Sequence, residues 1–168
     1  VIDYRQYGLS EGFISESGIY LDTQATYEHV TQEKGYRPDQ INVIGFSLGA
    51  NVAIQLCAKN EVNSLVSIAS FSTAKDIVHS KVPGFMHPLI WVKHELNALE
   101  AIPKVTAPIL FAHSPDDKVT PSYMSKELYE ATLSPKKMYV LKGGHNQAYT
   151  QNPQLFEEIK TWLQEERK

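Results

Sequence analysis

Residues 41–50 read INVIGFSLGA, and this run changes character at its centre. Its first half is a short apolar run with β-branched side chains, which is typical of a buried strand. From residue 50 to residue 58 the sequence ANVAIQLCA is rich in helix-forming residues. A glycine-x-serine-x-glycine pattern joins the two halves, with Ser47 in the middle. Between a strand and a helix, this pattern predicts a sharp turn that holds the serine in a strained conformation, the nucleophile elbow.

The residues around Ser47 suit a reactive serine. Gly45 and Gly49 are expected to leave room for the two backbones to approach closely, because glycine has no Cβ atom. The following helix should point its free N–H groups and positive dipole end at the serine. We therefore expect the N–H group of Leu48 to donate a hydrogen bond to an oxyanion. The same pattern also occurs by chance, so the rest of the chain has to support it.

Length and composition indicate an ordinary globular domain. The chain has 168 residues, a net charge of -3 and a pI near 6.1. A chain of this size buries about 70% of its surface on folding, enough for one domain with its own core. The charge gives no reason to expect nucleic acid or an anionic membrane as a partner. No apolar run approaches the roughly 18 residues that a membrane-spanning helix needs.

The cysteine and histidine residues argue against a disulfide or a cofactor. The single cysteine, Cys57, excludes an internal disulfide and favours a reducing compartment, so we expect a cytoplasmic protein. Cys57 lies in the apolar helix after Ser47, and we predict a small core residue rather than a nucleophile. No pair of histidines has convincing metal-ligand spacing. The sequence therefore predicts neither a metal nor another cofactor.

Short apolar runs alternate with helical patterns along the chain. Further strands are predicted at residues 62–69, 107–112 and 137–141, and helices at residues 19–34, after Pro121 and after Pro153. Thr120 suits the N-cap of the helix that Pro121 opens. The last helix should bury one apolar face, formed by Leu155, Phe156, Ile159, Trp162 and Leu163. This alternation predicts an α/β fold, a three-layer αβα sandwich around a mostly parallel sheet.

Two segments do not fit this alternation. Residues 1–4 read VIDY, the end of a strand that has already begun, and a glycine-punctuated loop follows. This start predicts that the chain is a fragment. Residues 70–104 are rich in proline, histidine and aromatic residues, and their helical periodicity is broken. We interpret them as a small cap of short helices, inserted at roughly residues 72–103 into a single domain.

Three polar residues follow three of the predicted strands, whose carboxyl ends meet at one edge of a parallel sheet. They are Ser47, then Asp116 or Asp117, then His145. Serine, acid and histidine in this order are the groups that hydrolysis through an acyl-enzyme requires. Ser47 would attack a carbonyl carbon, His145 would take its proton, and the aspartate would orient the imidazole. Each has an ordinary alternative, since a Gly-Gly-His-Asn run can be a tight turn and two aspartates can cap a helix.

The other histidines compete poorly for the role of base. His113 precedes the aspartates and is expected in the turn at the end of its strand. His29, His79, His87 and His94 lie in predicted helix or cap, and we expect them at the surface.

Four motifs make the chain resemble the α/β-hydrolase superfamily, from its fourth strand onward. They are DYRQYGLSEG at residues 3–12, GFSLG at 45–49, HSPDDKVTP at 113–121 and GHN at 144–146. Alignment on His113 and Pro121 implies Asp117 as the catalytic acid, with Asp116 second. The resemblance also implies that the cap shapes an acyl pocket, with candidate lining residues Phe46, Phe85, Met86 and Trp91. The most similar branch contains small esterases, thioesterases and peptidase-like proteins.

The resemblance leads us to expect a serine hydrolase that cleaves a small-molecule acyl ester or thioester. One alternative is a catalytically weak remnant of the fold with a binding or dimerisation role. Another is a peptidase or acyltransferase that uses the same triad.

The sequence also departs from the family, which has three more strands and a helix before its fourth strand. The loop after the third of those strands supplies a second oxyanion N–H, and the strand itself pairs with the one equivalent to residues 41–44. That strand is therefore expected to be a bare edge here. We expect a longer natural chain, a shift of the strand at residues 1–4 into the gap, or a homodimer through the open edge.

Overall fold

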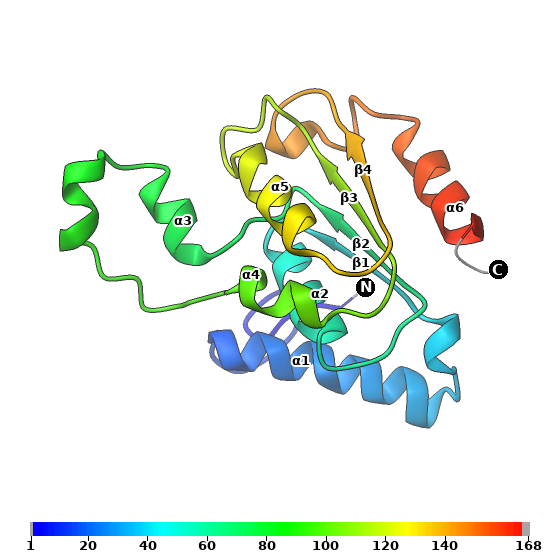
Figure 1. Cartoon of the computed structure of the whole chain (residues 1–168). Helices are drawn as coiled ribbons and strands as arrows, with labels where there is room; N and C mark the ends of the chain where they lie inside the picture. Colours follow the sequence, from blue (N-terminus) through cyan, green and yellow to red (C-terminus); the bar gives the residue numbers. More distant parts are fainter. Residues whose placement is uncertain (1, 166–168) are drawn as a thin grey trace.

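The computed structural model describes residues 2–165 and has a four-stranded parallel sheet at its centre (Figure 1). The strands are β1 (Asn42–Phe46), β2 (Ser64–Ile68), β3 (Ile109–His113) and β4 (Lys136–Val140). They lie in the order β1-β2-β3-β4, so each later strand pairs with the one before it in the chain. Phe46 pairs with Ile68, and Ile68 pairs with Ala112, which keeps the carboxyl ends level. The predicted parallel sheet is confirmed.

Helices cover both faces of the sheet and complete the predicted three layers. They are α1 (Glu16–Glu28), α2 (Leu48–Cys57), α3 (Ala74–His79), α4 (Ala98–Ala101), α5 (Ser122–Ala131) and α6 (Leu155–Glu165). α2, α4 and α5 pack against one face, and α6 covers the other (Figure 1). α1 packs on α2 and continues as a π-helical segment, His29–Glu33. Gly35 follows with φ +73°, the left-handed conformation expected after a helix C-terminus.

The two central strands carry the core, since every residue of β2 and β3 is buried. On one face, Leu65 and Phe111 pack with Ile54 of α2 and Leu128 of α5. The residues that alternate with these along the strands pack against α6 on the other face. Strands buried on both faces tend to read as apolar runs, and β3 does so almost throughout, whereas β2 also buries Ser64 and Ser67. In α6, Phe156 was wrongly predicted to be buried and is 60% exposed.

Cys57 lies in this core with 3% of its surface exposed, as predicted. Burial disfavours the thiolate and raises the pKa of the thiol to about 12. Because the thiolate is the reactive form, we expect dithionitrobenzoate to leave Cys57 unmodified in the folded protein and to modify it fully in denaturing urea. The released thionitrobenzoate, followed by absorbance, checks this expectation. Rapid modification of the folded protein would show that the core opens around α2.

The turn between β1 and α2 has the strained geometry that the sequence predicts. Ser47 has φ +53° and ψ -117°, in the half of φ space that side chains disfavour. A Cβ atom on Gly45 would lie 2.5 Å from Cα of Ala50 and would also overlap the carbonyl oxygen of Gly49. A Cβ atom on Gly49 would meet only Oη of Tyr4, at 3.8 Å. The steric requirement is therefore real at Gly45, whereas the same prediction for Gly49 is wrong.

Alanine substitutions at the two glycines should separate these cases. We expect Gly45→Ala to destabilise the protein by about 2–3 kcal/mol, because the new methyl group meets backbone atoms that cannot move aside. Gly49→Ala should leave stability unchanged or raise it by up to about 1 kcal/mol, since alanine is the better helix former. Urea denaturation followed by circular dichroism measures both. Equal losses at the two positions would contradict the asymmetry.

The N-terminal segment differs from its prediction. Ile2–Tyr4 form no strand, and Val1 lies outside the described residues. The segment turns back on itself instead, with the N–H of Tyr7 donating to the carbonyl of Tyr4 at 2.9 Å. Arg5 then forms an ion pair with Asp22 of α1 at 2.7 Å. The segment forms no strand beside β1, although Ile2 and Tyr4 line the groove next to it.

β1 is an edge of the sheet, as predicted, and has one strand neighbour among residues 2–165. Ile44 on this edge is 53% exposed. An apolar groove of about 480 Å³ runs between α1 and β1. Its lining includes Ile2, Tyr27, Val30, Ile41, Val43 and Ile44.

Residues 70–104 contain short helices and no strand. The middle of this segment extends away from the sheet, as the green trace of Figure 1 shows. Its return to the body is fixed by Glu16, whose carboxylate accepts from the N–H groups of Glu95 and Leu96, each at 2.9 Å. His79 and His87 were predicted at the surface, and they are half-buried there because their rings stack with centroids 4.0 Å apart.

Candidate active site

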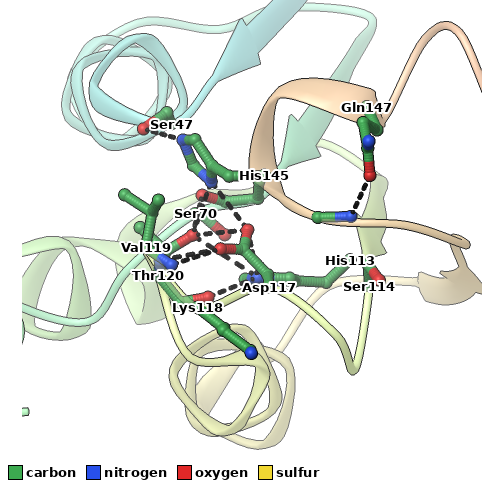
Figure 2. Close-up of polar contacts among 12 residues, drawn as sticks. Ser47, Ser70, His113, Ser114, Asp117, Lys118, Val119, Thr120, His145 and Gln147 are labelled. Carbon is green, nitrogen blue, oxygen red and sulfur yellow. Dashed lines mark hydrogen bonds and ion pairs between the residues drawn. The ribbon is translucent and has the colours of Figure 1, made fainter.

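The carboxyl ends of the strands bring three polar side chains together (Figure 2). Ser47 follows β1, Asp117 lies in the loop after β3, and His145 begins a short 3₁₀ helix after β4, His145–Gln147. Nε2 of His145 is 2.9 Å from Oγ of Ser47, and Nδ1 is 2.6 Å from Oδ2 of Asp117. The side chains of His145 and Asp117 are only 8% and 1% exposed. The three groups thus form one continuous hydrogen-bonded chain that is largely shielded from water.

The two adjacent aspartates occupy different positions. Asp116 is exposed, and its N–H donates to Oγ of Ser114 at 3.1 Å. Asp117 is buried, and its N–H donates to the carbonyl of Ser114 at 3.2 Å, which closes a tight turn. This turn points one aspartate outward and the next one inward. The structure therefore brings Asp117, and not Asp116, to His145 and Ser47.

The Asp117 carboxylate is held by donors from its own loop. Oδ1 accepts from the N–H groups of Val119 at 2.8 Å and Thr120 at 2.9 Å, and Oδ2 accepts from the Thr120 hydroxyl at 2.9 Å. Burial raises the pKa of Asp117, but the hydrogen bonds from His145, Thr120 and Val119 outweigh it and hold the pKa below its ordinary value. The ionised carboxylate can only accept, so Nδ1 of His145 carries a hydrogen. Nε2 of the neutral ring is then free to accept from Ser47.

Thr120 also belongs to this cluster, in a position that the sequence did not indicate. Its Oγ1 lies 3.1 Å from Nδ1 of His145 and 3.2 Å from the carbonyl oxygen of Ala69. The predicted N-cap role of Thr120 is wrong, because α5 begins at Ser122 with Pro121 in the N-cap position. The hydroxyl is turned toward the carboxylate instead. The available signal was the place of Thr120 in the HSPDDKVTP motif, which does not by itself show where the hydroxyl points.

Ser47 stands at the N-terminus of α2. Its carbonyl accepts from the N–H groups of Ala50 at 3.0 Å and Asn51 at 3.2 Å, so the first turn of the helix closes directly onto the serine. Leu48 is the first residue of α2, where an N–H group has no carbonyl partner within the helix. The positive end of the helix dipole adds a field that favours negative charge beside Ser47.

Of the four predicted pocket residues, Phe46 lies beside His145. Its ring centroid is 5.0 Å from that of His145. Contrary to the prediction, the structure does not bring Phe85, Met86 or Trp91 to Ser47. Phe85 and Trp91 are 81% and 83% exposed, on the segment that extends away from the sheet.

A small cavity of about 220 Å³ lies beside Leu48. Its apolar lining is formed by Ile14, Ile19, Leu48 and Leu96, and its polar lining by Ser15, Glu16 and His94.

Within residues 2–165, no group of three or more His, Cys, Asp or Glu side chains is arranged to hold a metal ion. Over the same range, no helix combines the length and the apolar character needed to cross a bilayer.

A parallel sheet between helical layers, with a strained serine between strand and helix, defines the α/β-hydrolase fold. Solved structures of this class superpose on the chain. The esterase Pf2001 of Pyrococcus furiosus matches with a TM-score of 0.77 at 20% identity, over 96% of this chain and 67% of that chain. At this level of identity the similarity shows the fold.

The chain belongs to the serine hydrolase (FSH1) family, whose model matches residues 16–147. Protein Rv2307c of Mycobacterium tuberculosis is 31% identical over 147 residues, which cover 87% of this chain and 52% of that protein. The human alpha/beta hydrolase domain-containing protein 17B is 26% identical over 171 residues, which cover 98% of this chain and 55% of that protein. The chain thus spans about half the length of these relatives.

Proposed function

We propose that this protein cleaves an ester or thioester of a small acyl substrate through an acyl-enzyme on Ser47. The observation that carries the proposal is the hydrogen-bonded chain from Ser47 through His145 to Asp117. Membership of a serine hydrolase family supports the class of reaction. Asp117 is buried, whereas the adjacent Asp116 is exposed, and this difference supports Asp117 as the acid.

In the proposed reaction, Oγ of Ser47 attacks the substrate carbonyl while Nε2 of His145 takes the serine proton. The N–H of Leu48 and the positive end of α2 stabilise the oxyanion that forms. His145 then gives the proton to the leaving alcohol or thiol, and the acyl group stays on Ser47. A water molecule, deprotonated by the same nitrogen, hydrolyses the acyl-enzyme and restores the serine. Asp117 remains ionised and keeps the imidazole in the productive tautomer.

The cavity beside Leu48 supports a short acyl chain as the group bound. The apolar side chains of Ile14, Ile19 and Leu96 line this cavity and would exclude water from a bound hydrocarbon chain. Its volume, about 220 Å³, is below the roughly 300–1,000 Å³ of pockets for drug-sized ligands. A short chain therefore fits this space better than a long fatty acyl chain does.

Hydrolysis of p-nitrophenyl esters of increasing chain length tests the proposed function. We expect acetate and butyrate esters to be cleaved faster than the laurate ester. A rapid burst of p-nitrophenolate, equal in amount to the protein, should precede steady turnover because the acyl-enzyme accumulates. Folded protein that cleaves neither these esters nor the matching coenzyme A thioesters would contradict the proposal.

The open edge of β1 favours a second proposal, that two copies of the chain associate. The exposed Ile44 and the groove between α1 and β1 leave apolar surface beside unpaired backbone groups. If a two-fold axis relates two copies, their β1 strands would pair with each other, and each copy would cover the apolar edge of the other.

A charged residue on the edge should weaken this association. We expect Ile44→Lys to shift the protein toward monomer, since lysine on an edge strand disfavours pairing. Analytical ultracentrifugation over a range of concentrations measures the change. Leu133→Lys is the matched control, because Leu133 is 81% exposed and lies after α5, away from β1. A wild-type protein that stays monomeric at every concentration would rule the proposal out.

A further inference from the structure

A second buried histidine lies behind the acid of the site. His113 was predicted in the turn at the strand end, but it is the last residue of β3 and is 4% exposed. Its Nε2 is 2.8 Å from the carbonyl oxygen of Thr120 and 3.3 Å from Oδ2 of Asp117. Its Nδ1 is 2.5 Å from Oγ of Ser125 on α5. Figure 2 shows His113 beside Asp117 on the side away from Ser47.

The partners of His113 fix which of its nitrogens carries the hydrogen. The carbonyl of Thr120 can only accept, so Nε2 is the donor. Burial lowers the pKa of His113, although Thr120 and the charge of Asp117 oppose this, and the ring is neutral at neutral pH. Nδ1 therefore accepts from the Ser125 hydroxyl. Oγ of Ser125 in turn lies 2.9 Å from Oγ of Ser70, which can donate to it and anchor the network after β2.

Thr120 links this network to the acid. His113 holds the carbonyl of Thr120, while the N–H and hydroxyl of the same residue hold the two oxygens of Asp117. A rotation of Thr120 would therefore break all three interactions at once. The carboxylate that faces His145 is thus held by the N–H of Val119 and by Thr120, whose own carbonyl accepts from His113.

We propose that His113 is a positioning residue of the triad, which holds Asp117 against His145 by clamping the backbone of Thr120. The proposal rests on the proposed function for its effect on turnover, but not for its effect on the hydrogen bond between His145 and Asp117. A purely structural role would change stability alone. A positioning role changes the geometry of the acid, and so lowers kcat while leaving KM near its original value.

Three substitutions test this. His113→Leu removes the donor to Thr120, and we expect kcat to fall about 10–100-fold with KM unchanged. His113→Gln keeps an N–H donor of similar reach and should recover most of that loss. Thr132→Val is the control, because Thr132 is also a buried polar residue, whose hydroxyl donates to the carbonyl of Leu128 at 2.7 Å and does not contact Asp117. It should lower stability without changing kcat.

Proton NMR reads the same effect without turnover. The hydrogen on Nδ1 of His145, shared with Asp117, should give a low-field resonance that His145→Gln removes. We expect His113→Leu to shift or broaden it, and Thr132→Val to leave it in place. If wild-type protein has no turnover that depends on Ser47, the proposed function fails and this resonance still decides the role of His113. If His113→Leu does not fold, Ser125→Ala replaces it, with an expected fall of about 3–10-fold in kcat. A folded variant with unchanged kcat and resonance overturns the proposal.

Discussion

Replacement of Ser47 by alanine is expected to lower kcat by at least about 10⁴-fold, because the proposed acyl-enzyme forms on the hydroxyl that this change removes. The same change should abolish covalent labelling by a fluorophosphonate, which requires a serine oxygen activated by a base. Steady-state hydrolysis of a p-nitrophenyl ester and mass spectrometry of the labelled protein measure the two effects. Ser80→Ala is the matched control, since Ser80 is exposed at the end of α3 and its hydroxyl donates to the carbonyl of Ile77, not to Ser47, Asp117 or His145.

The folded state of the Ser47→Ala variant has to be shown for this result to count. Alanine keeps the Cβ atom and therefore the strain of φ +53° at this position. We expect its urea midpoint to lie close to that of the wild-type protein. Ester hydrolysis that survives in this variant would remove Ser47 from the proposed mechanism.

Asp117→Asn is expected to lower kcat about 10⁴-fold, whereas Asp116→Asn should stay within about 2-fold of the wild-type value. The side-chain amide that replaces the Asp117 carboxylate can donate a hydrogen bond, so it favours the imidazole tautomer with the hydrogen on Nε2, facing Ser47. That tautomer cannot take the serine proton. Asp116 makes no contact with His145 and is exposed, so an amide in its place should be tolerated.

Asp116→Asn is the control for Asp117→Asn, because it makes the same chemical change one position earlier in the chain. Steady-state kinetics with one ester substrate compares them. A large loss at Asp116 with little loss at Asp117 would reverse the assignment of the acid.

The sequence predicted the sheet and the turn at Ser47 because these depend on local composition. The runs at residues 62–69 and 107–112 are apolar throughout most of their length, and the structure buries both faces of the strands there. The order of Ser47, acid and His145 was also readable, because each follows a strand. The order of the strands and loops alone did not distinguish Asp116 from Asp117. Their orientation depends on a turn in which the Ser114 hydroxyl and carbonyl accept from the two N–H groups.

Other features depended on contacts between distant parts of the chain. Phe85 and Trp91 lie in an aromatic-rich segment, and composition cannot show that this segment extends away from the site. The roles of Thr120 and His113 arise only when the ends of β2, β3 and β4 meet. The steric demand at Gly45 differs from that at Gly49 because of the direction of each Cβ atom relative to the turn, and the symmetric motif hides this difference.

The order of the strands sets when the site is completed during folding. Each strand pairs with its predecessor, so the sheet can grow by successive local crossovers. The bond between Ser47 and His145 instead spans 98 residues, and the entropy of closing that loop is lost before the contact can form. His145 therefore reaches Ser47 only after β4, the last strand among residues 2–165, has docked. In a chain whose β4 has not yet docked, Ser47 would lack the hydrogen bond to His145, so fluorophosphonate labelling of Ser47 would report only the molecules in which β4 is in place.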